Sequence, residues 1–181
     1  AIWGAQQSSC QPDRKYDGVF GMWYGKGPGL DRSIDALRHA HLIGTSKTGG
    51  ALAVVGDDHG MKSSDVPAAC ETMFMDLQFP VLYPSNVQEV LDLGLHGWAM
   101  SRFSGGWVGF KIVADAVDAS SSVYVDPARV EIILPNNFPF PPDGVNVRIP
   151  DLWTLQEERL VRYKVPAALA YGRINKLNRT V

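Results

Sequence analysis

Cysteine, surplus charge and long apolar segments are all scarce in this sequence. Its 181 residues include two cysteines, Cys10 and Cys70, without C-x-x-C spacing. That is too few for a disulfide framework, or for an iron–sulfur cluster, which takes about four thiolates. A net charge of -2 leaves no basic surplus for nucleic acid. No apolar run approaches the roughly 20 residues that cross a bilayer. We therefore expect reduced thiols, a cytoplasmic location, and neither nucleic acid nor membrane as a partner.

The motifs of several common enzyme classes are also missing. No G-x-S-x-G elbow accompanies Ser, His and Asp, which argues against a hydrolase. Residues 25–29 read Gly-Lys-Gly-Pro-Gly, but Lys26 is followed by Gly27, so a Walker loop fails. The third glycine of a dinucleotide fingerprint would fall on Leu30. Two interpretations remain: a turn without a ligand, or a glycine loop that lets a ligand approach the backbone closely.

Four short apolar runs of strand length are present. They occupy residues 19–23, 51–55, 79–83 and 107–113. Their spacing of about 30 residues is what a strand–helix–strand crossover needs. Apolar residues make up 45% of the chain and charged residues 20%, which suits a globular protein with a real core. The runs therefore predict the strands of a parallel sheet.

Helix signals fill the gaps between these runs. Asp31 or Ser33 can cap a helix that ends near Gly44. Residues 63–75 predict a second helix, opened by Ser63 or Ser64. The S-x-x-Q box at Ser85 predicts a third, up to about residue 104. The order predicts an α/β fold, a parallel sheet with helices on both faces, whose ligands sit at the carboxyl ends of the strands.

Residues 1–122 are therefore predicted to form the α/β domain, followed by two further parts. Residues 123–152 predict a proline-rich connector with an isolated strand at 130–134. Residues 153–181 predict a helical extension, opened by a capping box at Thr154 and kinked by Pro166. Residues 123–181 together are expected to pack on a part not present in this sequence. The chain begins without Met or a signal peptide, so we expect a piece of a longer polypeptide.

Polar residues concentrate after the second predicted strand, in residues 56–64. Asp57, Asp58 and His59 are metal-ligand types, but adjacent residues seldom all point inward. A solvated loop with a serine cap is one alternative. The other is a site for an anionic or carbonyl substrate, with Lys62 and His59 supplying positive charge or hydrogen bonds. His39 and His41 lie two residues apart and make a poor metal pair on a helix.

Long ungapped motifs connect these features to a known family. They occupy residues 23–33, 44–46, 49–50, 56–60, 62–64, 84–89, 91–94 and 162–170, and include Trp-Tyr-Gly-Lys-Gly-Pro-Gly and Gly-Asp-Asp-His-Gly. In these stretches the chain resembles the fused bacterial indolepyruvate ferredoxin oxidoreductases. The resemblance implies a thiamine-diphosphate enzyme that oxidatively decarboxylates aryl 2-oxoacids to acyl-CoA, with ferredoxin as electron acceptor. It places this chain in the pyrimidine-binding module.

The resemblance also implies site residues. Those for the cofactor are Tyr24, Gly25, Lys26, Gly27, Pro28 and Gly29. Those for the substrate are Asp58, His59, Lys62, Ser63 and Ser64. It places the activating glutamate upstream of Ala1, and the sites of the diphosphate, Mg2+ and 4Fe-4S clusters in other modules. No catalytic residue and no metal ligand is then expected here, the isolated chain should be inactive, and the whole enzyme should be a homo-oligomer.

Two alternatives remain open at this point. One is that the chain keeps the fold as a non-catalytic scaffold or interaction module. The other is that it belongs to a related thiamine-dependent enzyme that acts on a different 2-oxoacid, because the walls of the substrate pocket come partly from other modules.

Overall fold

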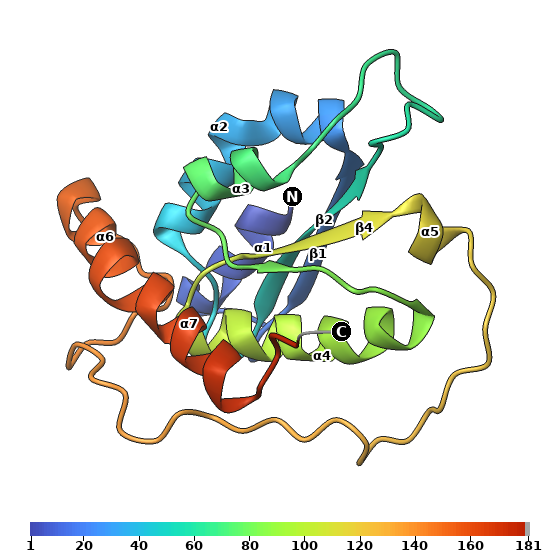
Figure 1. Cartoon of the computed structure of the whole chain (residues 1–181). Coiled ribbons are helices and arrows are strands. Elements are labelled where there is room, and N and C mark those ends of the chain that lie inside the picture. The colour runs from blue at the N-terminus through green and yellow to red at the C-terminus, as the bar shows by residue number, and fades with distance from the viewer. Residues whose placement is uncertain (180–181) are drawn as a thin grey trace.

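Four parallel strands between two layers of helices form the centre of the molecule (Figure 1). The structure is a computed structural model that describes residues 1–179. The strands are β1 Phe20–Lys26, β2 Gly50–Asp57, β3 Val81–Leu82 and β4 Val108–Val113, in the order β1-β2-β4-β3. Every adjacent pair is parallel. The predicted α/β class, and a strand in each of the four apolar runs, are thus confirmed.

The helices follow the chain on both sides of this sheet. They are α1 Ile2–Gln7, the 3-10 turn η1 Ser8–Cys10, α2 Gly27–Ile43, α3 Glu71–Asp76, α4 Val87–Ser104, α5 Ala114–Val117, α6 Trp153–Arg159, the π-helical turn η2 Leu160–Lys164 and α7 Val165–Ile174. No helix within residues 1–179 is both long enough and apolar enough to cross a membrane.

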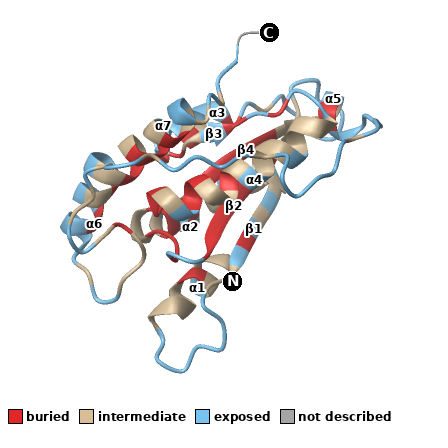
Figure 2. Cartoon of the chain, turned by 90° about the horizontal axis from the view of Figure 1, so that it is seen from below, coloured by how far each residue is buried: buried red, intermediate tan, exposed pale blue. Residues whose placement is uncertain are grey.

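The central strand β2 shows why two helical layers are needed. Ala51, Ala53 and Val55 are buried in the core cluster beneath α1, α2 and α3. Leu52 and Val54 point the other way, into the cluster under α4 and α7. Because side chains alternate along a strand, an almost wholly apolar strand must be covered on both faces. In Figure 2 the buried residues accordingly run through the middle of the sheet.

Two helix starts differ from the prediction. Helix α2 begins at Gly27, ahead of Asp31 and Ser33, and takes Pro28 into its first turn, where the missing N–H of proline costs nothing. Residues 25–29 are therefore the end of β1 and the start of a helix, and the predicted glycine loop is wrong. Helix α3 begins only at Glu71, because Pro67 and the turns before it leave residues 60–70 irregular.

Helix α4 occupies the predicted region, with a different cap. Its N-cap is Asn86, whose side chain accepts a hydrogen bond from the Glu89 N–H at 3.0 Å. The Glu89 carboxylate reaches back to the backbone N–H of Ser85 at 2.8 Å. The reciprocal pair is thus shifted by one residue from the predicted S-x-x-Q box. At the other end, Gly105 adopts a φ of 72, the left-handed conformation that ends many helices.

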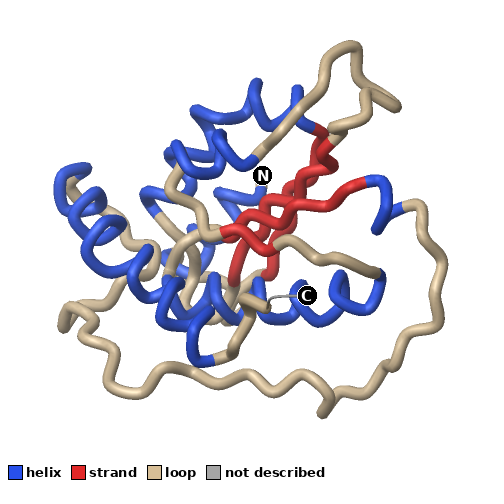
Figure 3. Tube along the Cα trace, in the orientation of Figure 1, coloured by secondary structure: helices blue, strands red, loops and turns tan. Residues whose placement is uncertain are grey.

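The segment between α5 and α6 crosses the molecule without regular structure, as its proline content predicts (Figure 3). The strand predicted at 130–134 does not form. Instead, the backbone N–H and C=O of Ile133 bond to the side chain of Asn175, at 2.9 and 2.7 Å. This side chain provides the partner that a neighbouring strand would otherwise supply.

The C-terminal helices pack on the rest of the chain, contrary to the expectation that they pack on an absent part. Ala168 and Tyr171 of α7 are buried in the cluster under α4. Helix α6 begins at Trp153 without a side-chain cap, so the box predicted at Thr154 is not used. The irregularity predicted near Pro166 is present, as the π-helical turn just before it. The division into three parts remains a prediction.

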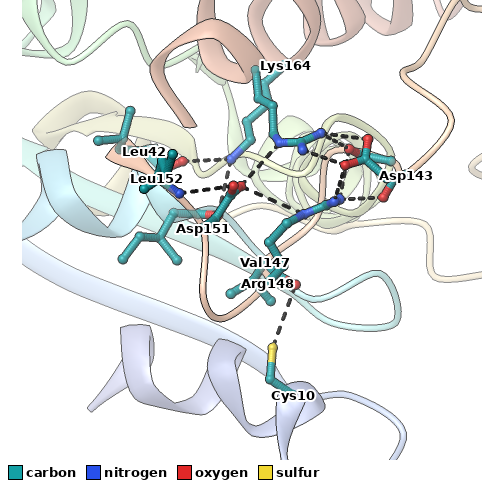
Figure 4. A network of polar contacts seen from close by, with 11 residues as sticks. Cys10, Leu42, Asp143, Val147, Arg148, Asp151, Leu152 and Lys164 are labelled. Carbon is teal, nitrogen blue, oxygen red and sulfur yellow. Dashed lines mark hydrogen bonds and ion pairs between the residues drawn. The ribbon is translucent and has the colours of Figure 1, made fainter. Parts of the chain in front are cut away.

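A polar network joins these helices to α2 and to the connector (Figure 4). The ammonium of Lys164 is buried and donates to the carbonyls of Leu42 and Ile43, at 2.9 and 3.2 Å, at the end of α2. Arg159 bridges Asp143, at 2.5 Å, and Asp151, at 3.3 Å. A cation at a helix C-terminus is favourable, since the last carbonyls lack partners.

Candidate functional site

The carboxyl ends of the strands bring the two polar stretches of the sequence together. In the β1–β2 register Lys26 lies opposite Gly56, so both strands end at one edge. The irregular residues 58–70 rise from this edge after β2, and α5 follows β4 there (Figure 3). Lys26 Nζ lies 2.5 Å from the Ser63 carbonyl oxygen, to which it donates. The predicted juxtaposition of residues 25–29 with residues 57–64 is therefore present.

The predicted cofactor residues differ in how much room they leave. A methyl group on Gly27 would lie 2.6 Å from the Cβ of Ala68, so residue 27 must be glycine for the 58–70 segment to pack this closely. A methyl group on Gly29 would meet nothing within 4 Å. Tyr24, the first of the predicted cofactor residues, is 80% exposed. An added side chain thus finds open space at Gly29 but not at Gly27.

Most of the predicted substrate residues bond to one another instead of converging on a common point. Asp58 accepts hydrogen bonds from the backbone N–H groups of Ser63 and Lys62, both at 2.8 Å, and these bonds lower the pKa of its carboxyl. The Lys62 ammonium lies 3.5 Å from Asp118 of the turn after α5. The Ser64 hydroxyl is buried and has no partner within residues 1–179. This segment is folded around the Asp58 carboxylate.

His59 is different, because it reaches a buried charged cluster on the α2–α3 side of the sheet. The centre is Lys111 of β4, whose side chain is 2% exposed. Its ammonium lies 3.2 Å from Asp57 Oδ2 and 3.1 Å from His59 Nε2, and it donates a hydrogen bond to the Glu71 carboxylate. The ring of Tyr83 lies 4.7 Å from the same nitrogen. We call Asp57, His59, Glu71 and Lys111 the Lys111 cluster.

The electrostatics of this cluster keep Lys111 charged. Burial alone would lower the pKa of its ammonium, but hydrogen bonds to Glu71 and Asp57 outweigh burial and raise it. The bond from Lys111 holds the pKa of Glu71 below its usual value. Burial and the neighbouring Asp57 raise the pKa of the Cys70 thiol to about 12, so this cysteine is inert as a nucleophile.

A metal ion does not fit the same residues while Lys111 is in place. Ligand atoms of Asp57, Cys70 and Glu71 lie within 4.8 Å of one another, which a metal could bridge. However, the ammonium already binds both carboxylates, and the raised pKa of Cys70 opposes the thiolate that a metal needs. The positive charge of this cluster is therefore the lysine itself.

The sequence predicts one member of the Lys111 cluster, His59, as a substrate residue. It offers Asp57 as a metal ligand, an interpretation that its position next to Asp58 and His59 disfavours. It missed Glu71, Lys111 and Tyr83. One signal was available: Lys111 is the charged residue in the otherwise apolar run 107–113. A lysine inside a buried strand requires a partner of opposite charge, and the polar stretch at the end of β2 supplies it.

His41 and His96 hold hydrogen bonds within the fold. His41 is buried, and its Nδ1 accepts from the Trp107 N–H at 2.9 Å while Nε2 lies 3.2 Å from the Gln78 carbonyl. Burial lowers its pKa to about 3. His96 Nδ1 lies 3.0 Å from the Tyr171 hydroxyl. Neither joins a metal-ligand group in the described part of the chain.

Two of the cavities lined by α4 lie away from this edge. One of about 860 Å³ lies between α4 and residues 132–148, and an apolar one of about 470 Å³ lies between α4, the sheet and residues 124–130. Neither contains a member of the Lys111 cluster. We place the candidate site at the carboxyl edge, because charge, hydrogen-bonding capacity and perturbed pKa values coincide there.

Comparison with known proteins yields no relative on which a family could be assigned. No model of a protein family matches the chain, and neither a curated protein nor a solved structure matches it significantly.

Proposed function

We propose that this chain is the pyrimidine-side module of a thiamine-diphosphate-dependent 2-oxoacid ferredoxin oxidoreductase acting on aryl 2-oxoacids such as indolepyruvate. One observation carries the proposal: the first turn of α2 and the polar residues 57–64 meet at the carboxyl edge of a parallel sheet. Ligands of open α/β sheets bind at this edge. The motif resemblance adds the identity of the cofactor, the acyl-CoA product and the ferredoxin acceptor.

The residues fit one part of the cofactor. The open space beside Gly29 suits a flat ring that approaches the backbone at the start of α2. The acidic residues of the Lys111 cluster are already paired with an ammonium, so they do not suit a magnesium–diphosphate group. When bound, thiamine diphosphate would supply a nucleophilic carbon for the 2-oxo group and a cationic thiazolium ring that takes up the electron pair released by decarboxylation.

The contribution of this chain to the substrate centres on His59. Its side chain is half exposed at the edge, and because its Nε2 lies against Lys111, the other ring nitrogen, Nδ1, is left for a hydrogen bond to a carboxylate or carbonyl oxygen. Lys62 pairs with Asp118, and Asp58 and Ser63 pair with each other. Of the five residues predicted to bind substrate, His59 is therefore the one we propose to contact the 2-oxoacid.

Substitution of Gly29, where an added side chain meets open space, tests the proposal. Gly29→Leu places a side chain where the cofactor ring would lie, and Gly172→Leu, on α7, is the matched control because its Cβ also meets nothing within 4 Å. Isothermal calorimetry of the protein with thiamine diphosphate and Mg2+ should show binding that Gly29→Leu weakens at least tenfold and Gly172→Leu leaves unchanged. Absence of binding by the unmodified protein, or equal affinity in both variants, contradicts the proposal.

A non-catalytic scaffold is the second candidate, and one observation favours it. Residues 58–63 satisfy their own polar groups, with Asp58 bonded to the backbone of the same segment. A segment built only for structure would look like this. The calorimetric experiment separates the two candidates, since a scaffold has no thiamine diphosphate site for Gly29→Leu to weaken. A homo-oligomeric state and a cytoplasmic location are part of the proposed oxidoreductase function.

A further inference from the structure

The Lys111 ammonium has no hydrogen-bonding capacity left for a ligand. An ammonium carries three N–H groups, and three acceptors surround this one: Asp57 Oδ2, Glu71 Oε1 and His59 Nε2. The side chain is 2% exposed. Lys111 therefore acts on a ligand at the edge through the residues it holds.

The contact with His59 fixes the position of the imidazole proton. Because the ammonium donates to Nε2 at 3.1 Å, Nε2 must present its lone pair, and the ring proton lies on Nδ1. Asp57 Oδ2, at 3.7 Å, is too far from Nε2 to accept a hydrogen bond. No protein group within residues 1–179 bonds to His59 Nδ1, and the side chain is 51% exposed.

We propose that Lys111 is a positioning residue that holds His59 in its Nδ1–H tautomer, so that this N–H donates to the carboxylate or 2-oxo oxygen of a 2-oxoacid bound at the carboxyl edge. The ligand class rests on the proposed function; the tautomer does not. Asp57 and Glu71 hold the ammonium in place. The Asp57 side chain is fully buried and binds it from the protein interior, and the Glu71 side chain, 49% exposed, binds it from the solvent side.

His41 serves as an internal reference, because its ring proton lies on the other nitrogen from that of His59. The Trp107 N–H donates to its Nδ1, so its proton lies on Nε2, which donates to the Gln78 carbonyl. In one spectrum of the nitrogen-labelled protein, the nitrogens of the two rings should therefore show reversed patterns. For His59 we expect a protonated, pyrrole-like Nδ1 and an unprotonated, pyridine-like Nε2; for His41 the reverse.

The test is a long-range proton–nitrogen correlation spectrum at neutral to mildly alkaline pH, with signals assigned from a His59→Gln variant. Lys111→Met removes the donor and should return His59 to a mixture of tautomers, while His41 stays unchanged. Lys62→Met, which breaks the exposed pair with Asp118, is the control and should leave both rings unchanged. A His59 that carries its proton on Nε2 in the unmodified protein overturns the proposal. That spectrum decides the question even if Lys111→Met does not fold.

The ligand is tested separately, so that the two failures can be distinguished. Titration of the unmodified protein with indolepyruvate should shift the Nδ1–H signal of His59 and leave His41 in place, and Lys111→Met should reduce the affinity at least severalfold. If the tautomer is as expected but indolepyruvate shifts nothing, the assignment of the ligand and the proposed function fail while the role of Lys111 stands. If His59 responds equally in Lys111→Met, the role of Lys111 is refuted.

Discussion

Lys111→Met tests how much the Lys111 cluster contributes to the free energy of unfolding. The substitution keeps most of the side-chain volume and removes the cation, leaving the Asp57 carboxylate, whose side chain is fully buried, without a counter-charge. Breaking a buried pair in this way typically costs about 3–5 kcal/mol. Since small domains have a total stability of about 5–15 kcal/mol, the variant should lie close to the limit of folding.

The assay is urea unfolding, followed by tryptophan fluorescence and circular dichroism. Lys62→Met serves as the control, because it removes a pair in which both side chains are about two-thirds exposed. Such a pair contributes about 0–1 kcal/mol. Adding Asp57→Asn to Lys111→Met removes the orphaned charge, so the double variant should regain part of the loss. Equal losses for Lys111→Met and Lys62→Met, or no recovery in the double variant, would refute the reasoning.

Three further predictions concern pH and packing. Because burial lowers the pKa of His41 to about 3, the unfolded chain binds a proton below pH 6.5 that the folded chain does not. Stability should therefore fall with pH below 6.5 by up to about 4–5 kcal/mol near pH 3, and this part of the loss should be absent in His41→Asn. Lys164 has its pKa lowered to about 7, by burial first and then by Arg159 and Arg148. Between pH 7 and 10 the unfolded chain binds the extra proton, so stability should rise with pH relative to Lys164→Met, as measured by unfolding at a series of pH values. Gly27→Ala should destabilise by about 1–3 kcal/mol, because its Cβ would lie 2.6 Å from Ala68, whereas Gly29→Ala should be neutral or stabilise by up to about 1 kcal/mol in the same urea assay.

The parallel sheet could be predicted from the sequence because its strands are buried on both faces. Their apolar runs are continuous, and crossovers of about 30 residues set their spacing. The edge to which residues 25–29 and 57–64 belong then follows from parallel topology alone. The sequence signals for the ends of helices are weaker than the signal of these apolar runs. Several side chains near each terminus can cap, and the choice among Ser85, Asn86 and their neighbours depends on where the tertiary structure places the first turn.

The long-range partners could not be predicted from the sequence. Asn175 satisfies the backbone of Ile133 from 42 residues away, so a strand-like run stayed a loop. Lys164 caps α2 from a distance of 122 residues in the chain. The Lys111 cluster joins β2, α3 and β4, and no motif spacing specifies that Glu71 and Lys111 meet. Such contacts are settled by packing and charge compensation in the folded chain.

The most direct test of the proposed function is to map ligand binding residue by residue. Thiamine diphosphate and indolepyruvate are added to the nitrogen-labelled protein, and the backbone amide signals are followed. We expect shifts confined to residues 24–29 for the cofactor and to residues 57–64 for the oxoacid, with the cofactor shifts lost in Gly29→Leu. Shifts that are absent, that fall on the cavity between α4 and residues 132–148, or that persist in Gly29→Leu would contradict a ligand site at the carboxyl edge of the sheet.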